Sequence, residues 1–275
     1  MISLVNSKKV KTTARNYLRG KWAAACLVSV ILLAAIFVSL LLCELVLGVF
    51  KSVIFNQIGT YTLLGTFIAA VIMLSMFVLS VPVIQGSVRW FWALIIDSEL
   101  PISELFYYYS SQSLLVNTLL LYVRVLFRYV VTAVACFTPS IAAWWISNGT
   151  IQKLTGYSIA LPLNIIKPAA IVLAVIGLIF FLIFALKTSL GFVLVVVDEQ
   201  LDYVHALVLS KKILAKKGIT ILTTLISYFG WLLLSTLGIT MLYTIPFILC
   251  SYVTAARFAI TNYRIKNRLT DKKIN

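Results

Sequence analysis

The sequence predicts an all-α integral membrane protein, a polytopic bundle of about six transmembrane helices with amphipathic helices on its cytoplasmic side. Apolar residues make up 62% of the chain and charged residues 11%, and the mean hydropathy is +1.05. About a quarter of the residues of a soluble domain are charged. Several uncharged runs also reach the roughly 20 residues that one helix needs to cross a bilayer core. Lipid is therefore the expected solvent for much of this fold.

The distribution of basic residues predicts an orientation. The chain has 23 lysines and arginines against 8 acids, a net charge of +15. In a soluble protein this excess would suggest nucleic-acid binding. Here 18 of the 23 lie before Trp22, in 85–113, in 187–218 or from Arg257 onward. These are the two ends of the chain and every second connection between the apolar runs. Cytoplasmic loops carry such an excess, so we expect both termini inside, contact with anionic headgroups and no nucleic-acid partner.

The longest apolar stretch, residues 219–260, is about twice the length required for one crossing. Lysines precede it and basic residues follow it. A hairpin fits both its length and its charge, with crossings at 219–235 and 239–260 and a turn near Ser235 to Gly238. Two glycines, Gly230 and Gly238, allow close packing, and Pro246 is expected to kink the second crossing.

The N-terminal segment 7–21 predicts an amphipathic helix on the inner leaflet, because Val10, Ala14, Tyr17 and Leu18 share one face. An uncleaved span at 22–46 follows, since its apolar run is nearly twice as long as a signal-peptide core. Cations on this helix and on a later one are predicted to contact anionic lipid: Lys8, Lys9, Lys11, Arg15, Arg19, Lys211, Lys212, Lys216 and Lys217.

The middle of the chain is interpreted as three further spans joined by loops. The expected order is a span at 61–84, a cytoplasmic membrane-hugging loop at 85–113, a span at 114–137, an outer stretch at 138–167 and a span at 168–186. Ser103 is a candidate helix cap, and Pro168 a first-turn residue. The helix that includes the last span is expected to continue along the inner interface to Val197.

A second interfacial helix is expected at 198–218. Acids lie at its start and lysines at its end, an order that complements the helix dipole, and Gly218 is the expected stop. One face is formed by Tyr203, Ala206, Leu207, Ser210, Ile213 and Leu214. Residues 261–275 form a basic cytoplasmic tail, and residues 1–275 together make one membrane domain.

Three ionisable residues are candidates for an intramembrane polar site. Arg124 and Arg128 share one helix face, and a central arginine costs about 2.5 to 3.5 kcal/mol on insertion scales, so both should face the bundle interior. They could form an anion or lipid-headgroup site or part of a conduction path, or they could snorkel or cap carbonyl groups. Glu44 lies about 33 Å along the first span, where hydration at the outer interface or pairing with Lys51 is expected.

The chemistry of an enzyme is not visible in the sequence. The only histidine, His205, has no second His or Cys at ligand spacing, so it is interpreted as a surface residue. The four cysteines lie in apolar runs without paired spacing and are interpreted as buried thiols: Cys26, Cys43, Cys136 and Cys250. We therefore predict no catalytic residues, no metal and no cofactor.

Three blocks resemble the bacterial integral membrane family catalogued as "domain of unknown function 975". They are "YLRGKW", Gly86 with the later "ELPISELF", and "HALVLSKKIL" followed by "LISYFGWLLLSTLGITMLYTIPF". The sequence departs from the family pattern in its long 138–167 stretch and in Phe247, where tyrosine is common. The resemblance implies a bacterial plasma membrane location and a structural role for the shared residues: Gly20, Trp22, Gly86, Leu105, Phe106, Ser210, Gly230, Trp231, Gly238 and Pro246. It implies no reaction.

Three functions remain open from the sequence. The favoured one is a non-enzymatic protein that organises or interacts within the bacterial envelope. The alternative is a small permease or export component that uses Arg124 and Arg128. An intramembrane enzyme is a second alternative, and it is disfavoured because no nucleophile and base pair or metal set is visible.

Overall fold

A computed structural model describes residues 7–58, 80–96, 101–147, 163–198, 201–228 and 240–274. Within these ranges the chain is helical apart from short turns, which confirms the all-α fold class. The named helices are α1 (Ser7–Leu18), α2 (Trp22–Ile58), the 3₁₀ helix η1 (Ile102–Tyr109), α4 (Gln112–Ser147), α6 (Leu163–Val197), α7 (Tyr203–Ile226) and α9 (Met241–Ile274). Residues 80–95 are also helical.

The chain divides into two compact units. Unit 1 contains Met1–Leu121 and Leu190–Asn275, and unit 2 contains Tyr122–Ser189. Each of the long helices α4 and α6 contributes residues to both units.

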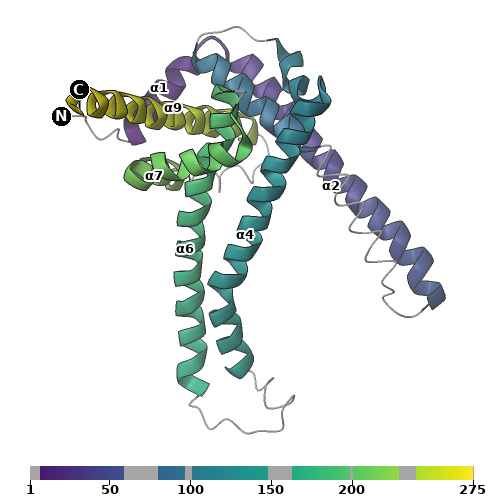
Figure 1. Ribbon diagram of the computed structural model, residues 1–275. Helices are drawn as coiled ribbons and strands as arrows, with labels where there is room; N and C mark the ends of the chain where they lie inside the picture. The colour runs from purple at the N-terminus through teal and green to yellow at the C-terminus, as the bar shows by residue number, and fades with distance from the viewer. Residues whose placement is uncertain are drawn as a thin grey trace. The chain divides into compact units, whose positions relative to one another are not determined.

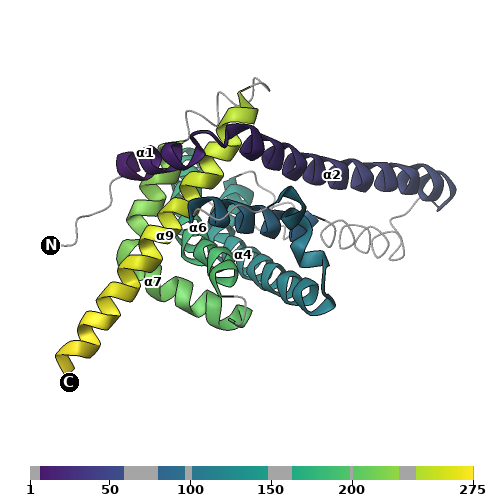
Figure 2. The ribbon, with the colours of Figure 1, turned by 90° about the horizontal axis from the view of Figure 1, so that it is seen from above.

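Helix α9 is the centre of unit 1. It packs against α1, α2 and α7, and Figure 2 shows it crossing α1 and α7. Cys250, Val253 and Ala256 of α9 are fully buried, and small side chains of this kind let neighbouring helices approach closely. The buried hydroxyl of Thr254 donates to the carbonyl of Cys250 at 2.7 Å, so its polar group is satisfied within the helix. An α-helix that is apolar on most sides is stable only when it is enclosed.

The apolar face of α1 is covered by protein. Val10, Ala14 and Leu18 are completely buried, and α1 packs on α9 and α7. The predicted amphipathic face is therefore present, but this chain's own helices cover it, leaving the cationic face outward. Gly20 then ends α1 with a φ of +82°, the left-handed conformation that suits glycine after a helix. This turn lets α2 begin at Trp22 in a new direction.

The predicted cytoplasmic loop at 85–113 is wrong in its first part, because residues 80–95 form a buried helix. Gln85, Phe91 and Ile95 are at most 1% exposed, and the side-chain amide of Gln85 donates to the carbonyl of Phe192 at 2.8 Å. The dense aromatic residues suggested a headgroup location, but a segment that is apolar on all sides can instead be enclosed by protein.

A 3₁₀ helix follows this buried helix and packs against it through a glycine. A Cβ added at Gly86 would lie 2.0 Å from the carbonyl oxygen of Leu105 in η1. The predicted Ser103 cap is also wrong, because the cap position is Pro101, and Ser103 lies inside η1. The side chain of Arg89 holds the same junction, because its Nε lies 3.3 Å from a Glu104 carboxylate oxygen and its guanidinium stacks on the Tyr107 ring.

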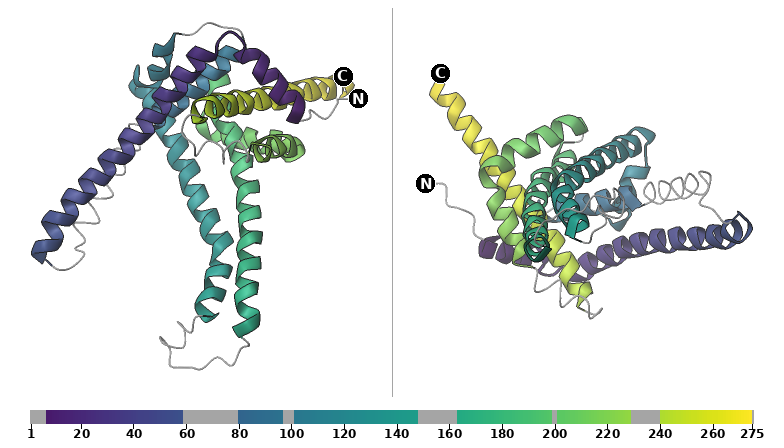
Figure 3. Two further views of the ribbon diagram at one scale, coloured as in Figure 1. Left: turned by 180° about the vertical axis from the view of Figure 1, so that it is seen from behind. Right: turned by 90° about the horizontal axis from the view of Figure 1, so that it is seen from below.

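Unit 2 is an antiparallel pair made from α4 and α6, which run side by side in Figures 1 and 3. The Tyr129 hydroxyl donates to the carbonyl of Ala185 at 3.2 Å, and a Cβ at Gly177 would lie 2.5 Å from the carbonyl oxygen of Cys136. The later contact on α4 is therefore made by the earlier residue of α6, as expected for antiparallel helices. The glycine thus sets a close helix approach, and the aromatic rings fill the seam on either side.

Several helices are longer than the sequence predicted. The outer stretch 138–167 begins and ends with helix, because α4 runs through Pro139 to Ser147 and α6 begins at Leu163, before Pro168. Proline inside a membrane helix is tolerated where neighbouring helices, hydroxyl groups or water satisfy the carbonyl group that it frees.

The same correction applies at the other helix ends. Helix α2 continues past residue 46 to Ile58, α7 passes the expected stop at Gly218 and ends at Ile226, and α9 includes the predicted tail as far as Ile274. Glycine in a helix interior costs only about 1 kcal/mol.

Within the described residues, four helices are long and apolar enough to cross a membrane: Trp22–Leu42, Gln112–Ile146, Ile166–Val197 and Thr240–Arg264. They correspond to four of the six predicted spans. Most of the predicted span 61–84, the second half of 219–235 and the turn between Ser235 and Gly238 lie outside the described residues. Four helices of this length and composition are consistent with a membrane protein.

Substitution Gly86→Ala should destabilise the protein by about 1–3 kcal/mol, because the added methyl group meets the η1 backbone and cannot be relieved by a rotamer change. The thermal unfolding midpoint in detergent measures this. The matched control is Gly48→Ala in α2, where an added Cβ meets nothing within 4 Å. Equal midpoints for the two variants would contradict the close approach at Gly86.

Candidate functional site

The two arginines expected inside the bundle lie in different environments. Arg128 is half-buried, and its Nη1 atom is buried without a hydrogen-bond partner among the described residues. Arg124 is exposed within the described structure. In a unit of two helices, only one face of α4 is covered by the other helix. Val125 and Tyr129 lie on that face. Arg128 borders that face, whereas Arg124 lies off it, so that within this helix pair only Arg128 is partly covered.

Glu44 is exposed on α2, two residues beyond the end of the candidate span at Leu42. It belongs to unit 1, whereas the two arginines belong to unit 2. The position just past the apolar window fits a hydrated carboxylate. The helix itself continues, so Glu44 does not mark a helix end.

An aromatic cluster anchors the start of α2 to α9. The rings of Trp22 and Tyr243 stack at 4.6 Å with an interplanar angle of 12°, and Phe247 lies 6.4 Å from Trp22. Tyr228 meets Phe247 edge to face at 5.4 Å. Such pairs contribute about 0.5–1.5 kcal/mol each beyond burial. Tyr243 and Phe247 lie on either side of Pro246 in the sequence of α9, and this proline removes one backbone donor from the helix.

Lys11 joins α1 to this cluster. Its ammonium lies 4.4 Å from the centroid of the Tyr228 ring and donates to the carbonyl of Ser227 at 3.1 Å. Partial burial lowers the pKa of Lys11. The Tyr228 hydroxyl in turn lies 2.5 Å from the Ser251 hydroxyl of α9. We predicted a headgroup contact for Lys11, but its ammonium is engaged within the protein.

Other cations of the predicted lipid contact set have exposed side chains, namely Lys8, Lys9, Arg15, Arg19, Lys211 and Lys212. The side chains of Lys216 and Lys217 lie outside the described part of the chain. On α7, the expected face is confirmed, since Ala206, Leu207, Ser210, Ile213 and Leu214 are buried while Tyr203 is half-buried. Both helices therefore bury one face and present cations on the other.

Arg257 is a central residue that the sequence interpretation missed. Its Nη1 donates to the carbonyl of Ile95 at 2.6 Å and to the Tyr17 hydroxyl at 3.1 Å. Ile95 ends the 80–95 helix, where carbonyl groups lack helical partners and a cation is favourable. From the sequence, Arg257 was counted only among the C-terminal cations that indicate the orientation. Its position between Ala256 and Phe258, in an apolar run, is the same signal that singled out Arg124.

The residues of the resemblance blocks have packing roles where the structure describes them. Leu105 and Ser210 are fully buried, while Phe106 is exposed. Gly20 forms the α1–α2 turn, Gly86 touches η1, and Trp22 stacks beside Pro246. Three of these residues, Gly230, Trp231 and Gly238, lie outside the described residues.

The described residues contain no group of three His, Cys, Asp or Glu side chains arranged to hold a metal ion. His205 is exposed, with its Nδ1 3.7 Å from a carboxylate oxygen of Asp202. Cys26 and Cys250 are free thiols that donate to backbone carbonyls of neighbouring helices, Leu242 at 3.3 Å and Ala14 at 3.6 Å. These contacts fit thiols that serve as small packing groups.

No protein-family model matches the chain, and searches of curated proteins and of solved structures gave no match. The resemblance described above remains an expectation from the sequence blocks.

Proposed function

We propose that this chain is a multi-pass protein of the bacterial plasma membrane, non-enzymatic, that organises or interacts with other components of the envelope. In this proposal the chain crosses the membrane about six times and both termini are cytoplasmic. The packed helices of unit 1 form an interaction platform on the inner leaflet, and α4 and α6 are embedded in lipid.

The observation that carries the proposal is the division of α1 into two faces. One face is sealed against α9 and α7, with Val10, Ala14 and Leu18 fully buried. The other presents Lys8, Lys9, Arg15 and Arg19 outward. Juxtamembrane cations are attracted to an anionic surface by about 1 kcal/mol each. A rigidly mounted cationic face suits a platform that rests on anionic headgroups.

Exposed apolar side chains on unit 2 support the lipid-embedded part. The side chains of four residues are each 60–68% exposed, namely Phe127, Val134, Ile171 and Phe180. Four such residues on the outside of a two-helix pair would be unfavourable in water. They are the expected surface of a helix pair surrounded by acyl chains.

The triple variant Lys8→Gln, Lys9→Gln, Arg15→Gln should lose most of its preference for anionic lipid. Spin-labelled phosphatidylglycerol and phosphatidylcholine, compared in reconstituted vesicles, give the relative association with the protein. Removing three surface cations should lower the anionic preference by about 3 kcal/mol at most, and high salt should remove the difference.

The matched control removes three cations from the connections expected outside, Lys51→Gln, Lys153→Gln and Lys167→Gln. It should keep most of the anionic preference of the wild type. An equal loss in both triples would mean that net charge, and not the α1 face, sets the preference. A reporter fused after Asn275 that is active only outside the cell would contradict the proposed orientation.

A second candidate, a small permease or export component, is favoured by one observation. The buried Nη1 of Arg128 has no hydrogen-bond partner among the described residues, and a buried polar group without a partner is costly. A passing anion could supply that partner. The exposed position of Arg124 gives no matching support.

Flux measurements in proteoliposomes separate the two candidates. If the first proposal is right, labelled anions, amino acids and sugars should not accumulate above protein-free vesicles. Arg128→Ala would then leave the background leak unchanged, as would the control Lys8→Ala. Accumulation of one solute class that Arg128→Ala abolishes and Lys8→Ala preserves would establish the permease instead.

A further inference from the structure

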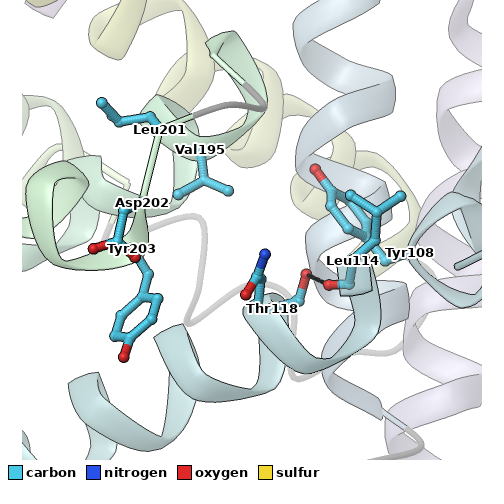
Figure 4. A pocket seen from close by; sticks show the side chains of 8 residues that line it. Tyr108, Leu114, Thr118, Val195, Leu201, Asp202 and Tyr203 are labelled. Atoms are coloured by element: carbon cyan, nitrogen blue, oxygen red, sulfur yellow. Dashed lines mark hydrogen bonds between the residues drawn. The ribbon is translucent and has the colours of Figure 1, made fainter. Parts of the chain in front are cut away.

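Unit 1 contains a cavity of about 210 Å³ that the proposed function does not use. Four segments line it: η1 with Tyr108, the first turns of α4, the last turn of α6 with Val195, and the start of α7. Figure 4 shows Asp202 and Tyr203 on one side of the cavity and Leu114 and Thr118 on the other. At roughly 30 Å³ per water molecule, it has room for about seven waters or one small polar group.

The charge of the lining selects the ligand's sign. Asp202 is the only charged side chain among the described residues that line the cavity, and no lysine or arginine is among them. This stands out in a chain with a net charge of +15. An anion placed here would face a carboxylate without a compensating cation, whereas a cation would gain a partner.

The hydrogen-bonding groups select the ligand's shape. An ionised carboxylate only accepts hydrogen bonds, and the contact from Asp202 to His205, at 3.7 Å, is longer than a hydrogen bond. The Thr118 hydroxyl already donates to the Leu114 carbonyl at 2.8 Å, so its oxygen is left only as an acceptor for a ligand in the cavity. The side-chain oxygen of Asn117 is a third acceptor in the lining.

Three acceptors match the three donors of a primary ammonium group. The half-buried Tyr203 and the almost fully buried Tyr108 add aromatic surface, which attracts cations. Leu114, Val195 and Leu201 give the cavity an apolar side that suits a short carbon chain.

We propose that this cavity binds a small organic molecule or headgroup that carries a primary ammonium. The same chemistry is found in a soluble amine and in an aminolipid headgroup. The cavity lies where the apolar windows of α4 and α6 begin and end, at Gln112 and Val197, so a lipid headgroup and a cytoplasmic solute are both able to supply the ammonium. The site adds a ligand to the proposed platform and does not depend on its lipid contacts.

The test uses the full-length protein in maltoside detergent and radiolabelled ethanolamine as the probe. Wild-type protein should bind it saturably. Asp202→Asn should weaken binding by about tenfold or more, because a charge-assisted hydrogen bond is worth about 1.5–3 kcal/mol. Asparagine is as good as aspartate at the start of a helix, so the variant should fold with an unchanged unfolding midpoint.

The matched control is Asp198→Asn, a nearby exposed carboxylate outside the cavity lining, which should change affinity by less than about twofold. Choline, which has no N–H donor, should compete at least about fivefold more weakly than ethanolamine. Inorganic phosphate should not compete. Unsaturable binding, an unaltered affinity in Asp202→Asn, choline as strong as ethanolamine, or displacement by phosphate would overturn the proposal.

Nanodiscs separate the two sources of the ammonium. Displacement of labelled ethanolamine by phosphatidylethanolamine nanodiscs, but not by phosphatidylcholine nanodiscs, would identify an aminolipid headgroup. Displacement by unlabelled ethanolamine alone would identify a soluble amine. Either pattern supports an ammonium site, and equal displacement by both lipids would contradict it.

Discussion

The arrangement of unit 1 depends on one cation inside an apolar helix. Arg257 lies in the candidate span Thr240–Arg264, where an unpartnered guanidinium is costly. Its two acceptors come from other parts of the chain, the end of the 80–95 helix and Tyr17 of α1. Helix α9 can keep this arginine only while both neighbours are in place. The need of the Arg257 guanidinium for hydrogen-bond acceptors therefore determines how α9, α1 and the 80–95 helix pack together.

The aromatic cluster fixes the opposite end of the same assembly. Trp22 stacks on Tyr243, and Lys11 reaches the Tyr228 ring and the adjacent carbonyl. Together with the bond from Arg257 to Tyr17, these contacts hold α1 at two points along its length and leave a defined set of cations outward. The interaction platform that we propose depends on these contacts, since an α1 that rotated freely would have no fixed cationic face.

The sequence predicted those features that follow from periodicity and composition. The buried faces of α1 and α7 and four helices of spanning character are present as expected, because burial of apolar surface dominates these choices. Helix ends were predicted poorly. Gly218 was interpreted as a helix stop and the outer stretch was expected to begin at 138, yet α7 and α4 continue through these positions. An interior glycine costs only about 1 kcal/mol, and an interior proline is tolerated in a membrane helix.

The candidate site was predicted less well than the fold, for a physical reason. Arg124 and Arg257 carry the same sequence signal, a cation in an apolar run, but only the contacts of the folded chain distinguish them. Likewise, the aromatic residues near Trp90 fit a headgroup zone and a protein interior equally well on composition. The cavity beside Asp202 joins segments from 108 to 203, a separation that no local pattern reveals.

The central claim is that Arg257 joins α9 to α1, and a double-mutant cycle tests it most directly. Free energies of unfolding in mixed micelles are compared for wild type, Arg257→Met, Tyr17→Phe and the double variant. The account predicts a loss of about 1–3 kcal/mol for Arg257→Met and a coupling energy of at least about 0.5 kcal/mol with Tyr17→Phe. Additive effects, or a more stable Arg257→Met variant, would contradict it.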